Sequence, residues 1–103
     1  MISRMWRGWT KPEDADAYEE LLREEILPAI DAREDMGYHG ACVLRNDDQE
    51  ETEFVTILWF SSMGDVERFA GQERSRSVIP EKARSFLIRS QDHVRHYEAV
   101  IGL

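Results

Sequence analysis

The segment Phe54–Phe60 constrains the fold most, because six of its seven side chains are apolar. Successive side chains of a strand point to opposite sides. One side would carry Val55, Ile57 and Trp59, and the other would carry Phe54, Thr56, Leu58 and Phe60. Both sides must therefore be kept from water, and the rest of the chain has too few apolar helical segments to cover both. We expect helices on one face of a sheet and a second copy of the chain on the other.

Length and composition limit the class of protein. The 103 residues predict one domain over residues 1–103. A net charge of −8, from 21 acidic and 13 basic residues, argues against nucleic acid or an anionic membrane as the main partner. The single Cys42 cannot form an internal disulfide, and no long apolar segment suggests a signal or a membrane span. We therefore expect a cytoplasmic protein.

The order of elements follows from periodicity and from capping residues. Residues 2–9 predict a strand, and Thr10 and Pro12 predict the cap and first turn of a helix that Pro28 distorts near its end. Strands are expected at about 40–45 and 53–60, joined by a polar turn at 46–52. Ser61 and Ser62 predict the cap of a second helix that ends at Gly71. A loop at 72–79, a short helix from Pro80 to about Arg89 and a strand from Asp92 to Val100 complete the chain.

This order, strand–helix–strand–strand–helix–strand, predicts the α+β class and a ferredoxin-like βαββαβ fold with an antiparallel sheet. The first strand agrees, since Met5 and Trp9 fall on one side and Ile2 and Trp6 on the other. Cys42, in the middle of the second strand, is expected to be a small core residue. Two such sheets meeting face to face would form a dimeric α/β barrel.

Two segments carry a resemblance to a known family. Trp59-Phe-Ser-Ser-Met-Gly-Asp-Val-Glu-Arg-Phe-Ala-Gly71 resembles the strand-to-helix signature of antibiotic biosynthesis monooxygenase-like proteins, and Val94-Arg-His-Tyr-Glu98 resembles their last strand. The resemblance implies a homodimer with a pocket between sheet and helices in each subunit. It also implies oxygenation of phenol- or quinol-type substrates with no metal, flavin or haem. Fold analogy alone does not select among the reactions of such a superfamily.

His96 and Arg4 are the candidate catalytic residues. A half-buried imidazole at His96 could take a phenolic proton or hold an anion, and the alternative is a structural histidine. Arg4 alternates with apolar residues in a presumed central strand, so its guanidinium needs a partner. That partner is an internal carboxylate, Glu98 or Glu53, or else a substrate carboxylate or enolate.

Four aromatic residues are candidates for binding a flat ligand: Trp6, Trp59, Tyr38 and Phe69. Large aromatic side chains also dominate ordinary cores, so core packing is the competing interpretation for each. The spacing of His93 and His96 puts them on opposite sides of a strand, which argues against a metal site. The haem-degrading branch of the superfamily is disfavoured, because the first strand has no Asn and residues 63–90 contain no His.

The leading hypothesis is a homodimeric, cofactor-independent monooxygenase-like protein that acts on a small aromatic phenol, quinol or anthrone. A non-catalytic dimer that binds a hydrophobic metabolite or serves a stress response is an alternative. A third possibility is an isomerase or lyase of the same fold that acts on a small carbonyl compound. The sequence contains no phosphate loop, nucleophile elbow or zinc-protease motif that would favour other chemistry.

Overall fold

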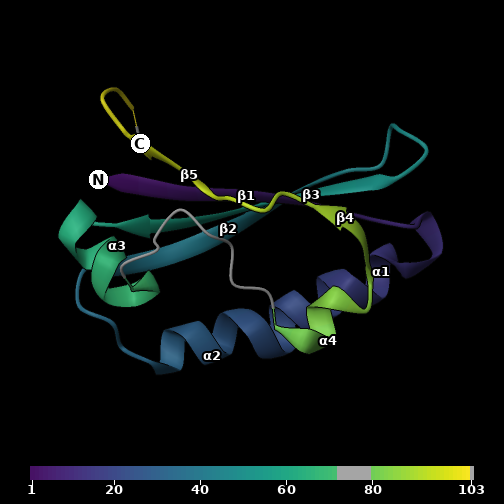
Figure 1. Ribbon diagram of the computed structural model, residues 1–103, viewed down its shortest axis with the longest axis horizontal. Helices are drawn as coiled ribbons and strands as arrows, with labels where there is room; N and C mark the ends of the chain where they lie inside the picture. Colours follow the sequence, from purple (N-terminus) through teal and green to yellow (C-terminus); the bar gives the residue numbers. More distant parts are fainter. Residues whose placement is uncertain (72–79, 103) are drawn as a thin grey trace.

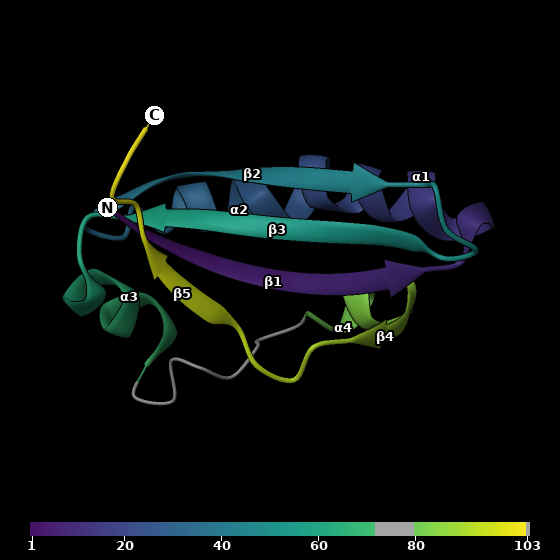
Figure 2. The same cartoon turned by 90° about the horizontal axis from the view of Figure 1, so that it is seen from above.

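A computed structural model describes residues 1–71 and 80–102, so the loop predicted at 72–79 lies outside the described residues. The structure has two layers, a five-stranded antiparallel sheet and a set of helices on one of its faces (Figure 1). No helix of the described residues lies on the other face, which Figure 2 shows from above with α1, α2 and α4 behind the strands and α3 beside β5. The predicted α+β, ferredoxin-like arrangement is confirmed.

The elements alternate along the chain as the sequence predicts for its first seventy residues. They are β1 (Ile2–Thr10), α1 (Pro12–Leu21), the π-helix η1 (Leu22–Ile26), α2 (Leu27–Ala32), β2 (Tyr38–Asn46), β3 (Thr52–Phe60), α3 (Met63–Ala70), α4 (Glu81–Arg84), β4 (Leu87–Ser90) and β5 (Arg95–Glu98). The sheet order is β2–β3–β1–β4, and β5 also pairs with β1. Strand β1 is therefore central, with β3 along one side and β4 and β5 sharing the other.

The end of the chain differs from the prediction. The helix expected over 80–89 is the single turn α4, and Leu87–Ser90 forms strand β4 against the Gly8–Thr10 end of β1. The strand expected over 92–100 is the shorter β5, paired with Ile2–Met5. The backbone groups of β1 need partners along their whole length, and two short strands supply them. The apolar periodicity of residues 80–89 carries no information about this requirement for hydrogen-bond partners, so it predicted a helix there.

The first helical segment contains the distortion that Pro28 predicts. Residues Leu22–Ile26 form a π-helix, in which the Leu27 N–H donates to the Leu22 carbonyl instead of that of Arg23. Proline has no N–H to donate and its ring displaces the preceding turn, so the wider turn just before Pro28 has a local cause. The cap prediction is wrong in detail: Lys11 is the N-cap residue, without a side-chain cap bond, and Thr10 belongs to β1.

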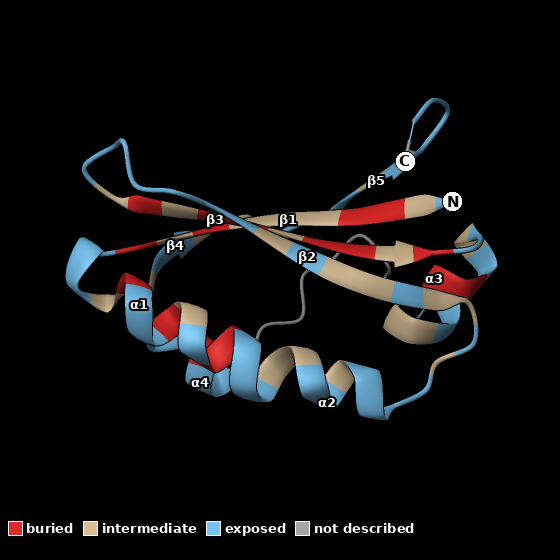
Figure 3. Ribbon diagram, turned by 180° about the vertical axis from the view of Figure 1, so that it is seen from behind, coloured by how far each residue is buried: buried red, intermediate tan, exposed pale blue. Residues whose placement is uncertain are grey.

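Most buried side chains lie between the helices and the sheet, and Val55 and Ile57 on the other face are also buried. Figure 3 shows buried positions on α1 and α3 and on strands β1 and β3. One cluster joins α1 to the middle of the sheet, where the rings of Tyr18 and Phe54 meet edge to face with centroids 4.8 Å apart. A second joins α3 to the end of β3 through Phe60 and Val66. Between these two clusters the layers are not fully filled, and that position contains the candidate site.

The opposite face of the sheet carries the other half of the strand side chains, and its centre is a group of largely apolar residues bordered by charged ones such as Arg7, Glu53 and Arg95. The members of this central group are Met5, Cys42, Leu44, Val55, Ile57, Trp59 and Tyr97. We call this set the uncovered face. Leu44 is 53% exposed and Tyr97 is 47% exposed, whereas Val55 and Ile57 are already buried, so in a single chain water reaches this face mainly at its outer strands β2 and β5. Cys42 is exposed on this face, and its predicted place in the core is wrong because the core lies on the helix side.

Candidate functional site

A cavity of about 570 Å³ lies between the sheet and the helices. Its walls come from β1, β3, the last turn of α1, η1, α2, the end of α3 and α4. Most of the lining residues are apolar: Trp6, Tyr18, Leu21, Leu22, Ile26, Leu27, Ala29, Ile30, Leu58, Phe69, Ala70, Pro80, Ala83 and Val94. The polar residues are Arg4, Glu25, Arg33, Thr56, Glu81 and Lys82. The size and the mostly apolar lining are those of small-molecule sites in proteins.

Arg4 provides the buried charge of the cavity. It lies in the central strand β1, directly across from Leu58 of β3, and its residue is only 5% exposed. Burial lowers the pKa of Arg4 from its ordinary value. An arginine nevertheless keeps its charge in proteins, so this end of the cavity holds a fixed cation in apolar surroundings.

His96 contacts Arg4 across the sheet. The two residues are paired in the register of β5 and β1, and Arg4 Nη1 lies 3.1 Å from His96 Nε2. A guanidinium has no acceptor, so Arg4 donates this hydrogen bond and His96 Nε2 accepts it. That nitrogen is therefore unprotonated in this contact. His96 is half-buried and is not among the residues that line the cavity.

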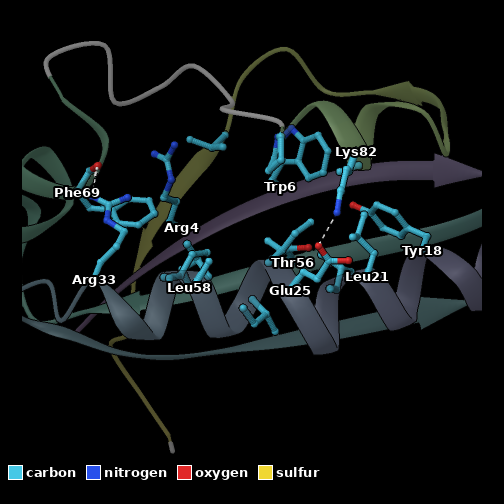
Figure 4. A pocket seen from close by; sticks show the side chains of 18 of the residues that line it. Arg4, Trp6, Tyr18, Leu21, Glu25, Arg33, Thr56, Leu58, Phe69 and Lys82 are labelled. Atoms are coloured by element: carbon cyan, nitrogen blue, oxygen red, sulfur yellow. Dashed lines mark hydrogen bonds and ion pairs between the residues drawn. The ribbon is translucent and has the colours of Figure 1, made fainter.

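Phe69 lies close to two guanidinium groups at this end of the cavity. Its ring centroid lies 5.9 Å from the guanidinium carbon of Arg4 and 4.4 Å from that of Arg33. Arg33 also donates to the Phe69 carbonyl at 3.1 Å and forms an ion pair with Asp35 at 2.8 Å. The C-terminal ends of α2 and α3 are thus joined by Arg33. Figure 4 shows Arg4, Arg33 and Phe69 together at one end of the cavity.

Trp6 and Thr56 form the middle of the sheet wall, directly across from each other in β1 and β3. The Trp6 indole Nε1 donates to the Gln91 carbonyl at 2.7 Å, and Gln91 is tied to both backbone groups of Arg7. These bonds bridge the interval between β4 and β5. They fix the indole plane against the cavity, which suits contact with a flat ligand.

The other end of the cavity is near the surface. Tyr18 and Leu21 close it from α1, and Lys82 of α4 forms an ion pair with Glu25 of η1 at 2.8 Å (Figure 4). Both charged side chains are more than half exposed, so this pair is solvated and contributes little to stability. An exposed pair can separate at low cost. We therefore expect a ligand to enter the cavity at this end, between Lys82 and Glu25.

Two predicted binding residues lie elsewhere. Trp59 is on the uncovered face, because it alternates with Leu58 and Phe60, whose side chains face the helices. Tyr38 packs beside Phe60, with ring centroids 5.5 Å apart, and does not line the cavity. Burial and the nearby Asp31 carboxylate raise the pKa of Tyr38 to about 12. Trp6 and Phe69, in contrast, do line the cavity.

One of the two carboxylates considered as a partner for Arg4 is engaged elsewhere. Glu53 forms an ion pair with Arg7 at 2.8 Å, not with Arg4, because residues 4 and 7 of β1 point to opposite faces. Thr56 and Arg33 also line the cavity, although neither was predicted as a site residue. A feature of the sequence could have indicated Thr56, since it is the one polar residue among the seven of Phe54–Phe60. No feature of the sequence indicates Arg33 as a lining residue, because the position of its side chain depends on how the end of α2 packs near α3.

Among the described residues, no group of three or more His, Cys, Asp or Glu side chains is placed to bind a metal ion. Within the same residues, the helices are too short or too polar to span a membrane.

The fold is shared with solved structures of one named class, the antibiotic biosynthesis monooxygenases. One, from Nitrosomonas europaea and provisionally named as such, aligns with a TM-score of 0.64 at 12% sequence identity. A second aligns with a TM-score of 0.65 at 17% identity. Each alignment covers 98% of this chain and 100% of the other. The sequence itself matches no model of a known protein family and no curated protein. At these identities the likeness establishes the fold.

Proposed function

We propose that this chain is a cofactor-independent, monooxygenase-like protein acting on a small aromatic compound of the phenol, quinol or anthrone type. The observation that carries the proposal is the largely apolar cavity of about 570 Å³ with the buried Arg4 at one end. Trp6 and Phe69 would contact the flat body of the substrate. Arg4 would stabilise the anion that forms when the substrate loses its acidic proton, since a fixed cation in an apolar site acts strongly on developing charge.

The reaction is balanced without an added reductant. An anthrone-type CH₂ group and one O₂ give a carbonyl group and one water, and the substrate supplies all the electrons. The substrate anion attacks dioxygen, a carbon–oxygen bond forms, and cleavage of the oxygen–oxygen bond releases the second oxygen as water. The protein would bind and orient the substrate, keep water away from it and stabilise its anion.

Oxygen uptake tests this proposal. We expect consumption of one O₂ per substrate with at least one member of a quinol and anthrone panel, and slower uptake with His96→Ala. Binding or a raised melting temperature without uptake would instead favour the non-catalytic dimer. A product of unchanged mass would favour an isomerase, because only oxygenation adds oxygen. Either result would contradict the monooxygenase proposal.

The proposal includes a homodimer formed through the uncovered face. Support comes from its apolar side chains, of which Leu44 and Tyr97 are about half exposed in a single chain. Charged pairs border the same face near Trp9: Arg7 with Glu53, and Arg89 with Glu51 at 2.9 Å. An apolar centre with a polar rim is typical of protein interfaces, and a twofold axis would pair the patch with itself. Sedimentation at micromolar concentration should show twice the mass of one chain; a monomer would contradict this part.

A further inference from the structure

The cavity has one charged, buried end, and the contacts there assign separate tasks to Arg4 and His96. Arg4 lines the cavity and is 5% exposed. His96 lies behind it, across the β1–β5 pairing, and receives a hydrogen bond from Arg4 on Nε2. The lone pair that a general base would use is therefore engaged by the guanidinium in this arrangement. The geometry favours a positioning task for His96 over proton transfer.

The second cation at this end is Arg33, which has a carboxylate partner and is partly exposed. Arg33 forms an ion pair with Asp35 and donates to the Phe69 carbonyl, and its side chain is 45% exposed. The Phe69 ring lies against both guanidinium groups. A ligand that enters from the Lys82 end and extends along Trp6 and Leu58 would place its leading group against Arg4 (Figure 4).

We propose that Arg4 determines specificity for a flat aromatic ligand whose leading group is an ionised acidic oxygen, a carboxylate or a phenolate, and that His96 positions Arg4. This inference deepens the proposed function and concerns the same site. A guanidinium recognises a carboxylate or phenolate oxygen through charge-assisted hydrogen bonds, which are stronger than those to a neutral group. An apolar, buried setting increases that difference, because water competes less for the charge.

The test compares two ligands of nearly the same shape, 2-naphthoate and 2-naphthamide, by isothermal titration calorimetry at pH 7. We expect the acid to bind the native protein about tenfold or more tightly than the amide, as a charge-assisted hydrogen bond predicts. Arg4→Met should remove the preference. Arg4→Lys, which keeps the charge, should retain part of it and serves if Arg4→Met does not fold. Arg23→Gln is the matched control, since Arg23 pairs with Glu19 on the outer helix surface.

The positioning task of His96 has its own readouts. His96→Gln, whose side-chain oxygen can accept from Arg4, should keep the preference for the acid, and His96→Leu should lose most of it. Nitrogen-15 NMR of the native protein should show His96 Nε2 as an unprotonated ring nitrogen. A protonated Nε2, or an unchanged preference in His96→Leu, would overturn the positioning role.

Equal affinity of the native protein for acid and amide would overturn the specificity claim, as would no binding of either at millimolar concentration. Neither result depends on a variant. Failure of the proposed function is distinguishable from failure of this inference. A strong acid preference without oxygen uptake supports the inference and contradicts the monooxygenase reaction. Oxygen uptake without a preference for the acid over the amide supports the monooxygenase reaction and contradicts the inference.

Discussion

Leu44→Glu is the sharpest test of the uncovered face as a dimer interface. Leu44 lies in β2, in register with Val55 of β3, and 53% of it is exposed in a single chain. Full burial of a leucine contributes about 2 kcal/mol, so covering this half contributes about 1 kcal/mol per copy. The two copies of a symmetric dimer lose about 2 kcal/mol together, or about 30-fold in Kd. Two buried carboxylates add a further penalty of several kcal/mol.

The assay is sedimentation velocity over a concentration series, with urea unfolding of each variant as a check on the fold. We expect Leu44→Glu to raise the dimer Kd by at least about 30-fold while the stability of the single chain changes by less than about 1 kcal/mol. Met36→Glu is the matched control, because Met36 is 75% exposed in the turn before β2 and should leave Kd unchanged. An unchanged Kd in Leu44→Glu, with the native protein dimeric, would show that the interface lies elsewhere.

Three further predictions concern the helices and their packing on the sheet. Phe54→Ala should lower the free energy of unfolding by about 3–5 kcal/mol in urea titrations, because Phe54 is fully buried and packs edge to face on Tyr18; a loss below 1 kcal/mol would contradict this core. Burial raises the pKa of Tyr18 to about 12, so its neutral form stabilises the fold below pH 10 and that contribution is lost as pH rises toward 12. Tyr18→Phe should therefore unfold less steeply in alkali than the native chain, and an identical alkaline profile would refute the assignment. Arg68 and Ser62 lower the pKa of Asp65, so its carboxylate stabilises α3 above the ordinary aspartate value, near 4, and that contribution is lost as pH falls through the folded value. Asp65→Asn should flatten the acid limb of the stability profile, whereas an unchanged limb would show that Asp65 contributes nothing there.

The first seventy residues could be predicted from the sequence because local signals and tertiary demands agree there. The two-faced strand at Phe54–Phe60 predicted both the sheet and its one-sided helix layer. The pair of bonds between Ser62 and Asp65 is the cap that their spacing indicates: Asp65 N donates to Ser62 Oγ at 3.2 Å, and Ser62 Oγ donates to Asp65 Oδ2 at 2.9 Å. The wide turn before Pro28 likewise has a local cause.

The end of the chain and the positions of the site residues depend on strand pairings that cannot be predicted from local sequence patterns. Alternation places Trp59 and Leu58 on opposite faces of β3. Both faces of this strand are apolar, so the strand alone does not indicate which face the helices cover. The contact of Arg4 with His96 depends on the register of strands 92 residues apart. Strand β4 forms because β1 needs a partner, although its own sequence resembles the end of a helix. The site residues were therefore predicted as a set of candidates, and only Arg4, Trp6 and Phe69 line the cavity.

We propose that this cavity promotes direct reaction of an aromatic anion with dioxygen. The most direct measurement is mass spectrometry of the product formed under ¹⁸O₂ by the native protein and by Arg4→Met. We expect one ¹⁸O atom in the product, the other in water, and a slower rate in the variant. A product whose new oxygen comes from water, or a rate that Arg4→Met leaves unchanged, would contradict it.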